Sequence, residues 1–197
     1  NNTFTTGQSN IVKDGSNNIV SGYNNTSNQN RNSFLLGNEN NNQTMLSSGV
    51  LGEKNTTIST TNSIIVGKEN NDNLSKNSVS IGLKNASVRP ISSIVGGEEN
   101  SVTDVSNTIV YGKKNIANTS KQSIIVGSTN NSNYDNNSGI IGNNNTNNTV
   151  QNMLVVGHDN TSTSNLSNLT VGKSNNVTNG ETSGVFGSDN TENKSEA

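Results

Sequence analysis

Cysteine and tryptophan are missing from this sequence of 197 residues, proline and histidine each occur once, and aromatic residues make up only 3%. Without cysteine, neither a disulfide framework nor a thiolate metal site can form. Twelve basic residues stand against 14 acidic ones, and no position is consistently basic, so nucleic-acid binding has no electrostatic basis. No apolar run approaches the roughly 18 residues that span a bilayer, and no signal peptide is recognisable. We expect any export or anchoring segment to lie outside this sequence.

Residues for catalysis are equally scarce. His158 is the only histidine and directly follows a glycine, where an exposed side chain is the more ordinary interpretation than an acid–base role. Glu98 and Glu99 form the only adjacent acidic pair, which is typical of a solvated turn. The stretch from Gly96 does not extend to the glycine- and aspartate-rich calcium repeat of other β-rolls. We therefore expect no enzyme activity, no cofactor and no metal ion.

What the sequence does contain is glycine at every fifteenth position, with asparagine three positions after each. Thirteen copies follow one another without insertion or deletion, from Gly7 and Asn10 to Gly187 and Asn190. A fixed period of this size predicts a solenoid with one coil of backbone per repeat. We take the unbroken period to mean one domain over residues 1–197. The turn ladder is represented by Gly67, Asn70, Gly82, Asn85, Gly127 and Asn130.

The three residues before each glycine are mostly β-branched or aromatic, as in Ile64-Ile65-Val66, which predicts a short strand. Because neighbouring side chains on a strand point to opposite faces, three adjacent apolar residues indicate that both faces are dry. One thin coil can cover only one face, and no amphipathic helix is present to cover the other. We expect other copies of the chain to cover it, so that Ile65→Asp or Ile125→Asp would break the assembly.

Glycine and asparagine also predict the first turn of each coil. Glycine allows positive φ, and asparagine tolerates the left-handed region while bonding nearby backbone. Stacked asparagine amides can form a continuous ladder, and the serine or threonine four positions before most of the glycines can do likewise with hydroxyls. The rest of each repeat is mostly Asn, Ser and Thr, which we interpret as a second, outer strand.

The segments Asn62-Ser-Ile-Ile-Val-Gly-Lys-Glu-Asn70 and Asn77-Ser-Val-Ser-Ile-Gly-Leu-Lys-Asn85 resemble the Asn-Ser-Val-Ala-Ile-Gly-x-x-Ser repeat of the YadA-like head in trimeric autotransporter adhesins. The likeness covers all thirteen repeats. It implies a left-handed parallel β-roll, three chains packed into one head, and display from the outer membrane of a Gram-negative bacterium. It also implies host attachment, by binding collagen, fibronectin or a cell-surface receptor such as a CEACAM.

The sequence departs from that family in three ways. Its repeats have fifteen residues where the family commonly has fourteen, and they are rich in asparagine instead of alanine. Bulkier residues such as Ile65 often stand at the family's alanine, which would alter packing on the axis side of the trimer. The neck, stalk and membrane anchor of the family have no counterpart here. We expect an excised head, anchored only through segments that are not in this chain.

Residues that break the pattern of their position are the candidate receptor contacts. Tyr23 and Leu83 follow a glycine where other repeats are mostly polar, and Tyr134 stands in a polar neighbourhood. Exposed apolar groups near arginine are typical of binding hot spots. The segment Arg89-Pro90-Ile91 holds the only proline, which we expect to reshape one outer edge.

Two other function classes stay open. An ice- or carbohydrate-binding solenoid would need a regular outer row of threonine. The best row lies four positions after each glycine but is interrupted. An enzyme on a β-helix scaffold would need an acid and base constellation that the sequence does not show. The preferred interpretation is a homotrimeric adhesin head at the bacterial cell surface that binds a host protein without catalysis.

Overall fold

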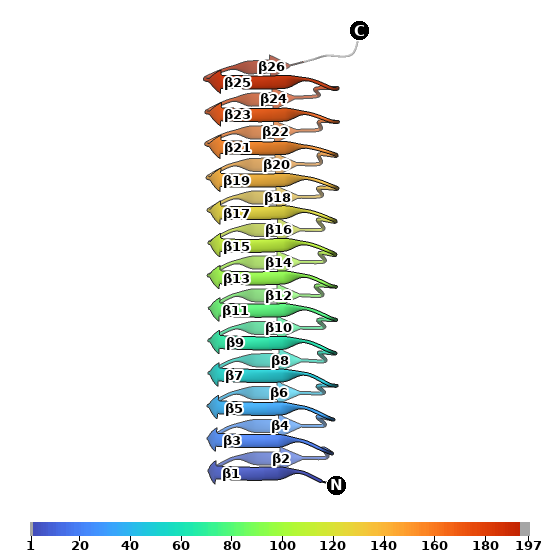
Figure 1. Cartoon of the computed structure of the whole chain (residues 1–197), viewed down its shortest axis with the longest axis vertical. Helices are drawn as coiled ribbons and strands as arrows, with labels where there is room; N and C mark the ends of the chain where they lie inside the picture. Colours follow the sequence, from blue (N-terminus) through green and yellow to red (C-terminus); the bar gives the residue numbers. More distant parts are fainter. Residues whose placement is uncertain (1, 194–197) are drawn as a thin grey trace. The chain divides into compact units, whose positions relative to one another are not determined.

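The computed structural model describes residues 2–193, which form an all-β parallel solenoid of about 13 turns without a helix. Because this part of the chain contains no helix, it contains none that could cross a membrane. The chain divides into two compact units, Asn1–Glu99 and Asn100–Ala197. In each unit a five-residue strand alternates with a three-residue strand (Figure 1). The predicted solenoid of parallel strands is thus confirmed.

Over its described residues, 2–99, the first unit contains seven long and six short strands. Its long strands are β1 (Phe4–Gln8), β3 (Ile19–Tyr23), β5 (Phe34–Asn38), β7 (Gly49–Glu53), β9 (Ile64–Lys68), β11 (Val79–Leu83) and β13 (Ile94–Glu98). Its short strands are β2 (Ile11–Lys13), β4 (Thr26–Asn28), β6 (Asn41–Gln43), β8 (Thr56–Ile58), β10 (Asn71–Asn73) and β12 (Ala86–Val88). Long strands pair only with long strands and short with short, so each unit has two sheets.

The second unit repeats this arrangement. Its short strands are β14 (Ser101–Thr103), β16 (Ile116–Asn118), β18 (Asn131–Asn133), β20 (Thr146–Asn148), β22 (Thr161–Thr163), β24 (Asn176–Thr178) and β26 (Thr191–Asn193). Its long strands are β15 (Ile109–Lys113), β17 (Ile124–Ser128), β19 (Gly139–Asn143), β21 (Leu154–His158), β23 (Leu169–Lys173) and β25 (Gly184–Ser188).

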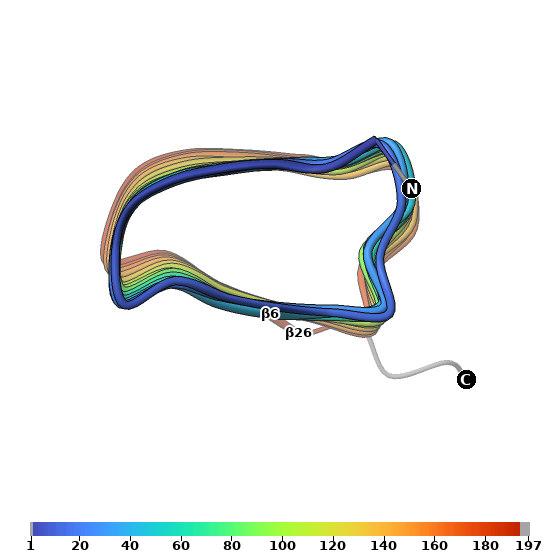
Figure 2. The ribbon, with the colours of Figure 1, turned by 90° about the horizontal axis from the view of Figure 1, so that it is seen from below.

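The register places equivalent residues of successive repeats beside each other. Ile64 pairs with Val79, and Gly67 pairs with Gly82. Seen end-on, each turn of the solenoid is a flattened loop (Figure 2). One further residue per repeat, such as Lys76, forms a single-residue bridge to the next repeat within the second turn. The sequence did not predict this third contact.

The interior of the loop is lined by the second residue of each long strand after β1. Val20, Leu35, Val50 and Ile65 pack together with Met45 in the first unit. In the second unit Val150, Met153 and Val155 form a comparable cluster. Ile65 and Ile125 are 0% and 1% exposed. They therefore lie inside their own chain and not on an assembly face, so the prediction that placed this position on the axis side is wrong.

The first turn depends on the repeated glycine. Gly67 has a φ of 126°, and a Cβ atom there would lie 2.0 Å from the carbonyl oxygen of Gly82. Asn70 donates through Nδ2 to Asn55 Oδ1 at 3.1 Å and to the Gly82 carbonyl at 2.9 Å. The predicted amide ladder is confirmed. The left-handed residue of this turn is Glu69 (φ 55°), however, and not the asparagine that follows it.

The other members of the turn ladder share this geometry. Asn85 donates to Asn70 Oδ1 at 3.2 Å, and Asn130 donates to the Gly142 carbonyl at 2.7 Å. Gly82 and Gly127 have φ values of 126° and 129°. These residues hold successive repeats together and are buried or partly buried, so their role is structural.

The second turn contains two further left-handed residues per repeat, such as Leu74 (φ 58°) and Asn77 (φ 52°). Asparagine tolerates this region better than other residues with a side chain, which accounts for part of the asparagine content. The buried serines that follow link repeats through backbone N–H groups. Ser78 N donates to Ser63 Oγ at 3.3 Å, while Ser63 Oγ donates to the Thr61 carbonyl at 3.0 Å. The prediction that hydroxyl-to-hydroxyl bonds connect these serines is therefore wrong.

Candidate interaction surface

The outer face of the long-strand sheet carries large apolar side chains. Ile64 is 46% exposed whereas its neighbour Ile65 is fully buried, because successive side chains of a strand point to opposite faces. We call this outer face the apolar face of each unit. In the first unit its most exposed members are Phe4, Ile19, Phe34, Leu51, Ile64, Ile81 and Ile94. In the second unit they are Ile109, Tyr111, Ile124, Ile141, Leu154 and Phe186.

Exposed apolar side chains that line one face of a sheet in this way are typical of an interaction surface. The sequence predicted two apolar faces on these strands, one inside the coil and one outside. The structure confirms the inner apolar face, and the outer apolar face is exposed in the single chain. Whether further copies of the chain cover the outer face stays a prediction.

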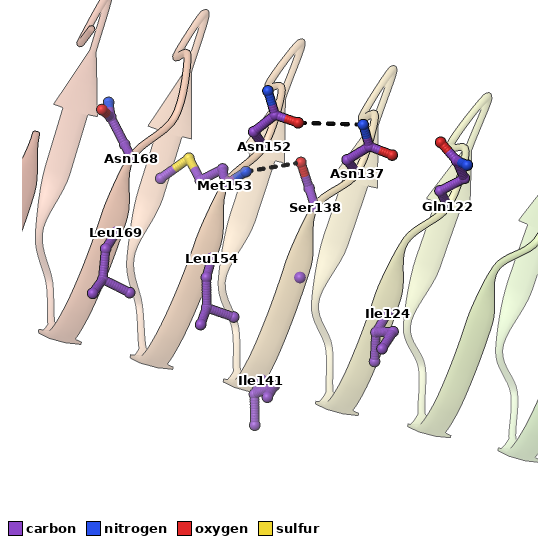
Figure 3. Close-up of a pocket in the computed structure, with 11 residues that line it drawn as sticks. Gln122, Ile124, Asn137, Ser138, Ile141, Asn152, Met153, Leu154, Asn168 and Leu169 are labelled. Atoms are coloured by element: carbon purple, nitrogen blue, oxygen red, sulfur yellow. Dashed lines mark hydrogen bonds between the residues drawn. The ribbon is translucent and has the colours of Figure 1, made fainter. Parts of the chain in front are cut away.

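A hollow of about 670 Å³ interrupts the apolar face of the second unit (Figure 3). It arises because Gly139 has no side chain where neighbouring repeats have Ile124 and Leu154. Amides form its rim, with Asn137 Nδ2 donating to Asn152 Oδ1 at 3.2 Å. In the first unit, Gly49 occupies the same position of its repeat, but the ring of Phe34 covers it, since a Cβ on Gly49 would lie 2.0 Å from that ring.

The six predicted contact residues do not form one site. Tyr23 (47% exposed) and the partly buried Leu83 end long strands, whereas Arg89 and Ile91 belong to a second turn. Tyr134, 60% exposed, lies in a second turn of the other unit. That these residues contact a receptor stays a prediction.

The prediction that Pro90 reshapes an outer edge is wrong. It is buried, and its carbonyl accepts hydrogen bonds from Lys76 N at 3.0 Å and Ser78 Oγ at 3.2 Å. Its repeat keeps the strand pattern of the repeat before it, including the bridge between Lys76 and Ile91. The proline therefore does not reshape an outer edge, and its side chain is not available to a partner.

A second group of exposed residues lies along the second turns of the first unit. Parallel bridges connect Arg31 to Leu46, Leu46 to Thr61, Thr61 to Lys76, and Lys76 to Ile91. We call these five residues the second-turn strip. Sequence reasoning found only Ile91 of them. Comparing the ninth position after each glycine across repeats would have found the others, because that position reads cation, aliphatic, hydroxyl, cation, aliphatic only in this half of the chain.

The first turns of the first unit carry paired charges. Lys54 lies 3.8 Å from Glu39, Lys68 lies 3.3 Å from Glu53, and Lys84 lies 3.7 Å from Glu69. The hydrogen bond from Lys68 is the main reason that the pKa of Glu53 is lowered. All these side chains are well exposed, so the pairs add little to stability and chiefly neutralise this edge.

Two carboxyl groups are enclosed inside the loops. Asp72 accepts a hydrogen bond from the Ser75 hydroxyl, its Oδ2 has no hydrogen-bond partner, and burial raises its pKa to about 7. Burial likewise raises the pKa of Asp135 to about 6, although Ser132, 2.5 Å away, partly opposes this effect. Both side chains are only 1% exposed, which keeps them from any substrate at the surface.

The other candidates from the sequence, His158 and the threonine row, lie at the surface. His158 is exposed, and its Nδ1 is 3.0 Å from a carboxylate oxygen of Asp159. Across residues 2–193 no three His, Asp or Glu side chains gather closely enough to hold a metal ion. The threonine row considered for ice binding begins the short strands, with Thr26 and Thr56 partly exposed and Asn41 between them, so it is interrupted in space as in sequence.

Comparison with known proteins does not assign the chain to a family. No protein-family model matches the chain, and no curated protein sequence matches it. The fold places the chain among all-β parallel solenoids, with an exposed apolar face on the long-strand sheet.

Proposed function

We propose that this chain is the head of a trimeric surface adhesin, built from left-handed coils of fifteen residues and displayed at the outer membrane of a Gram-negative bacterium. The observation that carries the proposal is the apolar face. Ile64, Ile94 and Ile124 are each between 45% and 48% exposed in the single chain. A surface so apolar favours burial against copies of itself, and cyclic symmetry places the same repeat of each copy around a common axis.

The repeat sequence supports the same class. Its resemblance to the YadA-like head extends over all thirteen repeats, and the parallel solenoid is compatible with that resemblance. In such a head the function is attachment: a host receptor of the CEACAM type or an extracellular-matrix protein binds the outer surface. Three copies bind together, so weak single sites give strong attachment.

Assembly is tested first, by size-exclusion chromatography with light scattering. We expect three times the mass of the 20.7 kDa chain. A stable monomer at micromolar concentration would contradict the proposal.

Attachment is tested next, with the trimeric chain immobilised and a panel of host receptor ectodomains, collagen and fibronectin passed over it. Binding of at least one partner, absent from an unrelated solenoid of similar charge, is the expected result. Uniform failure across the panel would remove the support for adhesion while leaving the assembly result intact.

A further inference from the structure

The second-turn strip of the first unit has a regular chemical order. Along the parallel bridges it reads cation, aliphatic, hydroxyl, cation, aliphatic, at Arg31, Leu46, Thr61, Lys76 and Ile91. Leu46 is 42% exposed and Ile91 is 47% exposed. These residues occupy a different position of the repeat from those of the apolar face, so covering that face does not account for them.

Two shallow hollows lie along the strip, each with a cation beside an aliphatic side chain. The first, about 220 Å³, is lined by Gln29, Arg31, Thr44, Met45 and Leu46. The second, about 260 Å³, is lined by Ser59, Leu74, Lys76, Arg89 and Ile91. Leu74 is 44% exposed, and Ile58 at the end of β8 adds a further side chain that is 38% exposed.

The charges of the strip are not neutralised within the chain. Neither Arg31 nor Lys76 forms an ion pair with any residue between 2 and 193, and neither hollow is lined by an acidic side chain. This differs from the first turns of the same unit, where each of Lys54, Lys68 and Lys84 has an acidic partner. Cations beside exposed aliphatic groups complement a partner that is both acidic and apolar.

The spacing of the two cations restricts the shape of that partner. Arg31 and Lys76 are three repeats apart, which corresponds to about 14 Å at the usual distance between neighbouring strands. An extended chain covers that distance in about four residues, and its side chains at positions i, i+2 and i+4 share one face. Carboxylates at i and i+4 would then face Arg31 and Lys76, with the residue at i+2 above Leu46 and Thr61.

We propose that the second-turn strip binds an extended acidic segment of a partner protein, with two carboxylates four residues apart and an aliphatic residue midway between them. This inference rests on the proposed attachment function and assigns part of it to one surface. It selects a protein segment over a polyanion such as a nucleic acid or sulfated glycan, because the two cations of the strip, with Arg89 beside the second hollow, are too few among aliphatic groups to hold a densely charged chain.

The test measures fluorescence anisotropy with a labelled decapeptide that carries two glutamates four positions apart and leucine midway. A second peptide has glutamine in place of both glutamates. We expect the full 197-residue chain to bind the glutamate peptide more tightly, and added salt to weaken that binding. The double variant Arg31→Glu/Lys76→Glu should raise its Kd about tenfold or more, and Leu46→Ser should raise it severalfold.

Matched controls come from the second unit, where Lys121 and Leu166 occupy the same position of the repeat as Lys76 and Leu46. Lys121→Glu and Leu166→Ser should leave the Kd of the glutamate peptide unchanged. Equal binding of the two peptides, or equal effects of strip and control variants, would overturn the proposal. Heparin binding that depends on Arg31 and Lys76 without peptide binding would also overturn it, in favour of a sulfated glycan.

The strip and the adhesin can fail separately. If the double variant remains trimeric and still binds its host protein at full strength, the strip is not the attachment surface, while the adhesin proposal stands. If the wild-type chain is monomeric and binds no host protein but does bind the glutamate peptide, the adhesin proposal fails and the strip's preference for acidic segments stands.

Discussion

Asn70 and Asn55 lie one repeat apart, and the Asn70 side-chain amide donates to the Asn55 side-chain carbonyl at 3.1 Å. The same Asn55 oxygen also accepts from the Asn70 backbone N–H at 3.0 Å. Asn70 in turn accepts from Asn85 N at 3.0 Å. Each asparagine of the column thus satisfies backbone groups of two repeats, so its removal affects both neighbours.

Asn70→Ala should lower the free energy of unfolding by about 3 kcal/mol, because it leaves Asn85 N and the Gly82 carbonyl without their partner in a buried place. Chemical denaturation followed by circular dichroism measures the loss. Asn62→Ser is the control. The side chain of Asn62 forms a hydrogen bond only to the exposed Asn77 side chain, and serine occupies the same position in other repeats. Comparable losses in both variants would show that the buried column is not special.

Gly67→Ala should destabilise the chain by about 3 kcal/mol or more, since alanine is strained at a φ of 126° and its Cβ would meet the Gly82 carbonyl. Gly139→Ala is the matched control, because the nearest atom there is the end of the flexible Leu154 side chain at 3.0 Å. Thermal unfolding of the two variants gives the comparison. Retention of the wild-type Tm by Gly67→Ala would argue against the observed stacking of glycine on glycine.

Ile64 and Ile65 are adjacent in sequence but face opposite sides of the sheet. Ile65→Asp should cost at least about 4 kcal/mol and unfold the surrounding repeats, because it buries a charge without a partner. Ile64→Asp should leave the fold of the chain intact but abolish the proposed trimer. Circular dichroism reports the first effect and light scattering the second. A trimer that survives Ile64→Asp would place the assembly interface elsewhere.

Asp72 should make stability fall as the pH rises. Its folded-state pKa of about 7 lies above the ordinary value of 3.8, so the folded chain keeps a proton that the unfolded chain has lost. Stability is therefore greatest at and below about pH 4, declines up to about pH 7, and is level above it. The difference is on the order of 4 kcal/mol.

Urea unfolding at several pH values tests this dependence, with Asp72→Asn as the comparison. The amide cannot titrate, so the variant should lose most of the decline between pH 4 and 7. The part that remains should come from Asp135, whose pKa is also raised. Identical pH profiles for the variant and the wild type would show that Asp72 does not carry the proton.

The sequence predicted the fold well because its strongest signals are local and repeated. The glycine column, the asparagine ladder and the short apolar run before each glycine each follow from the needs of one turn, and thirteen copies leave little ambiguity. The position of Ile65 was misjudged because three adjacent apolar residues do not say which of them points inward. The burial of Pro90 was missed because the sequence alone does not show that this position of the repeat points inward, as Met45 and Val105 do at the same position.

The candidate site was less predictable. Single residues that break a pattern, such as Tyr23 and Tyr134, were found at once, but Tyr23 ends a long strand of the first unit and Tyr134 lies in a second turn of the second unit. The second-turn strip depends on residues fifteen positions apart that meet only once the chain is wound, such as Arg31 and Leu46. The hollow at Gly139 depends on a missing side chain, whose consequence differs from that at Gly49 only because Phe34 is near the latter.

The contact between glycines of successive repeats also restricts how such a chain can evolve. Since the space beside Gly67 is filled by the carbonyl of Gly82, any inserted segment must supply a glycine in the same place. Duplication of one whole repeat meets this requirement automatically, whereas the gain or loss of a single residue would shift every later glycine out of line. Lineages that carry this protein should thus vary in length by whole repeats.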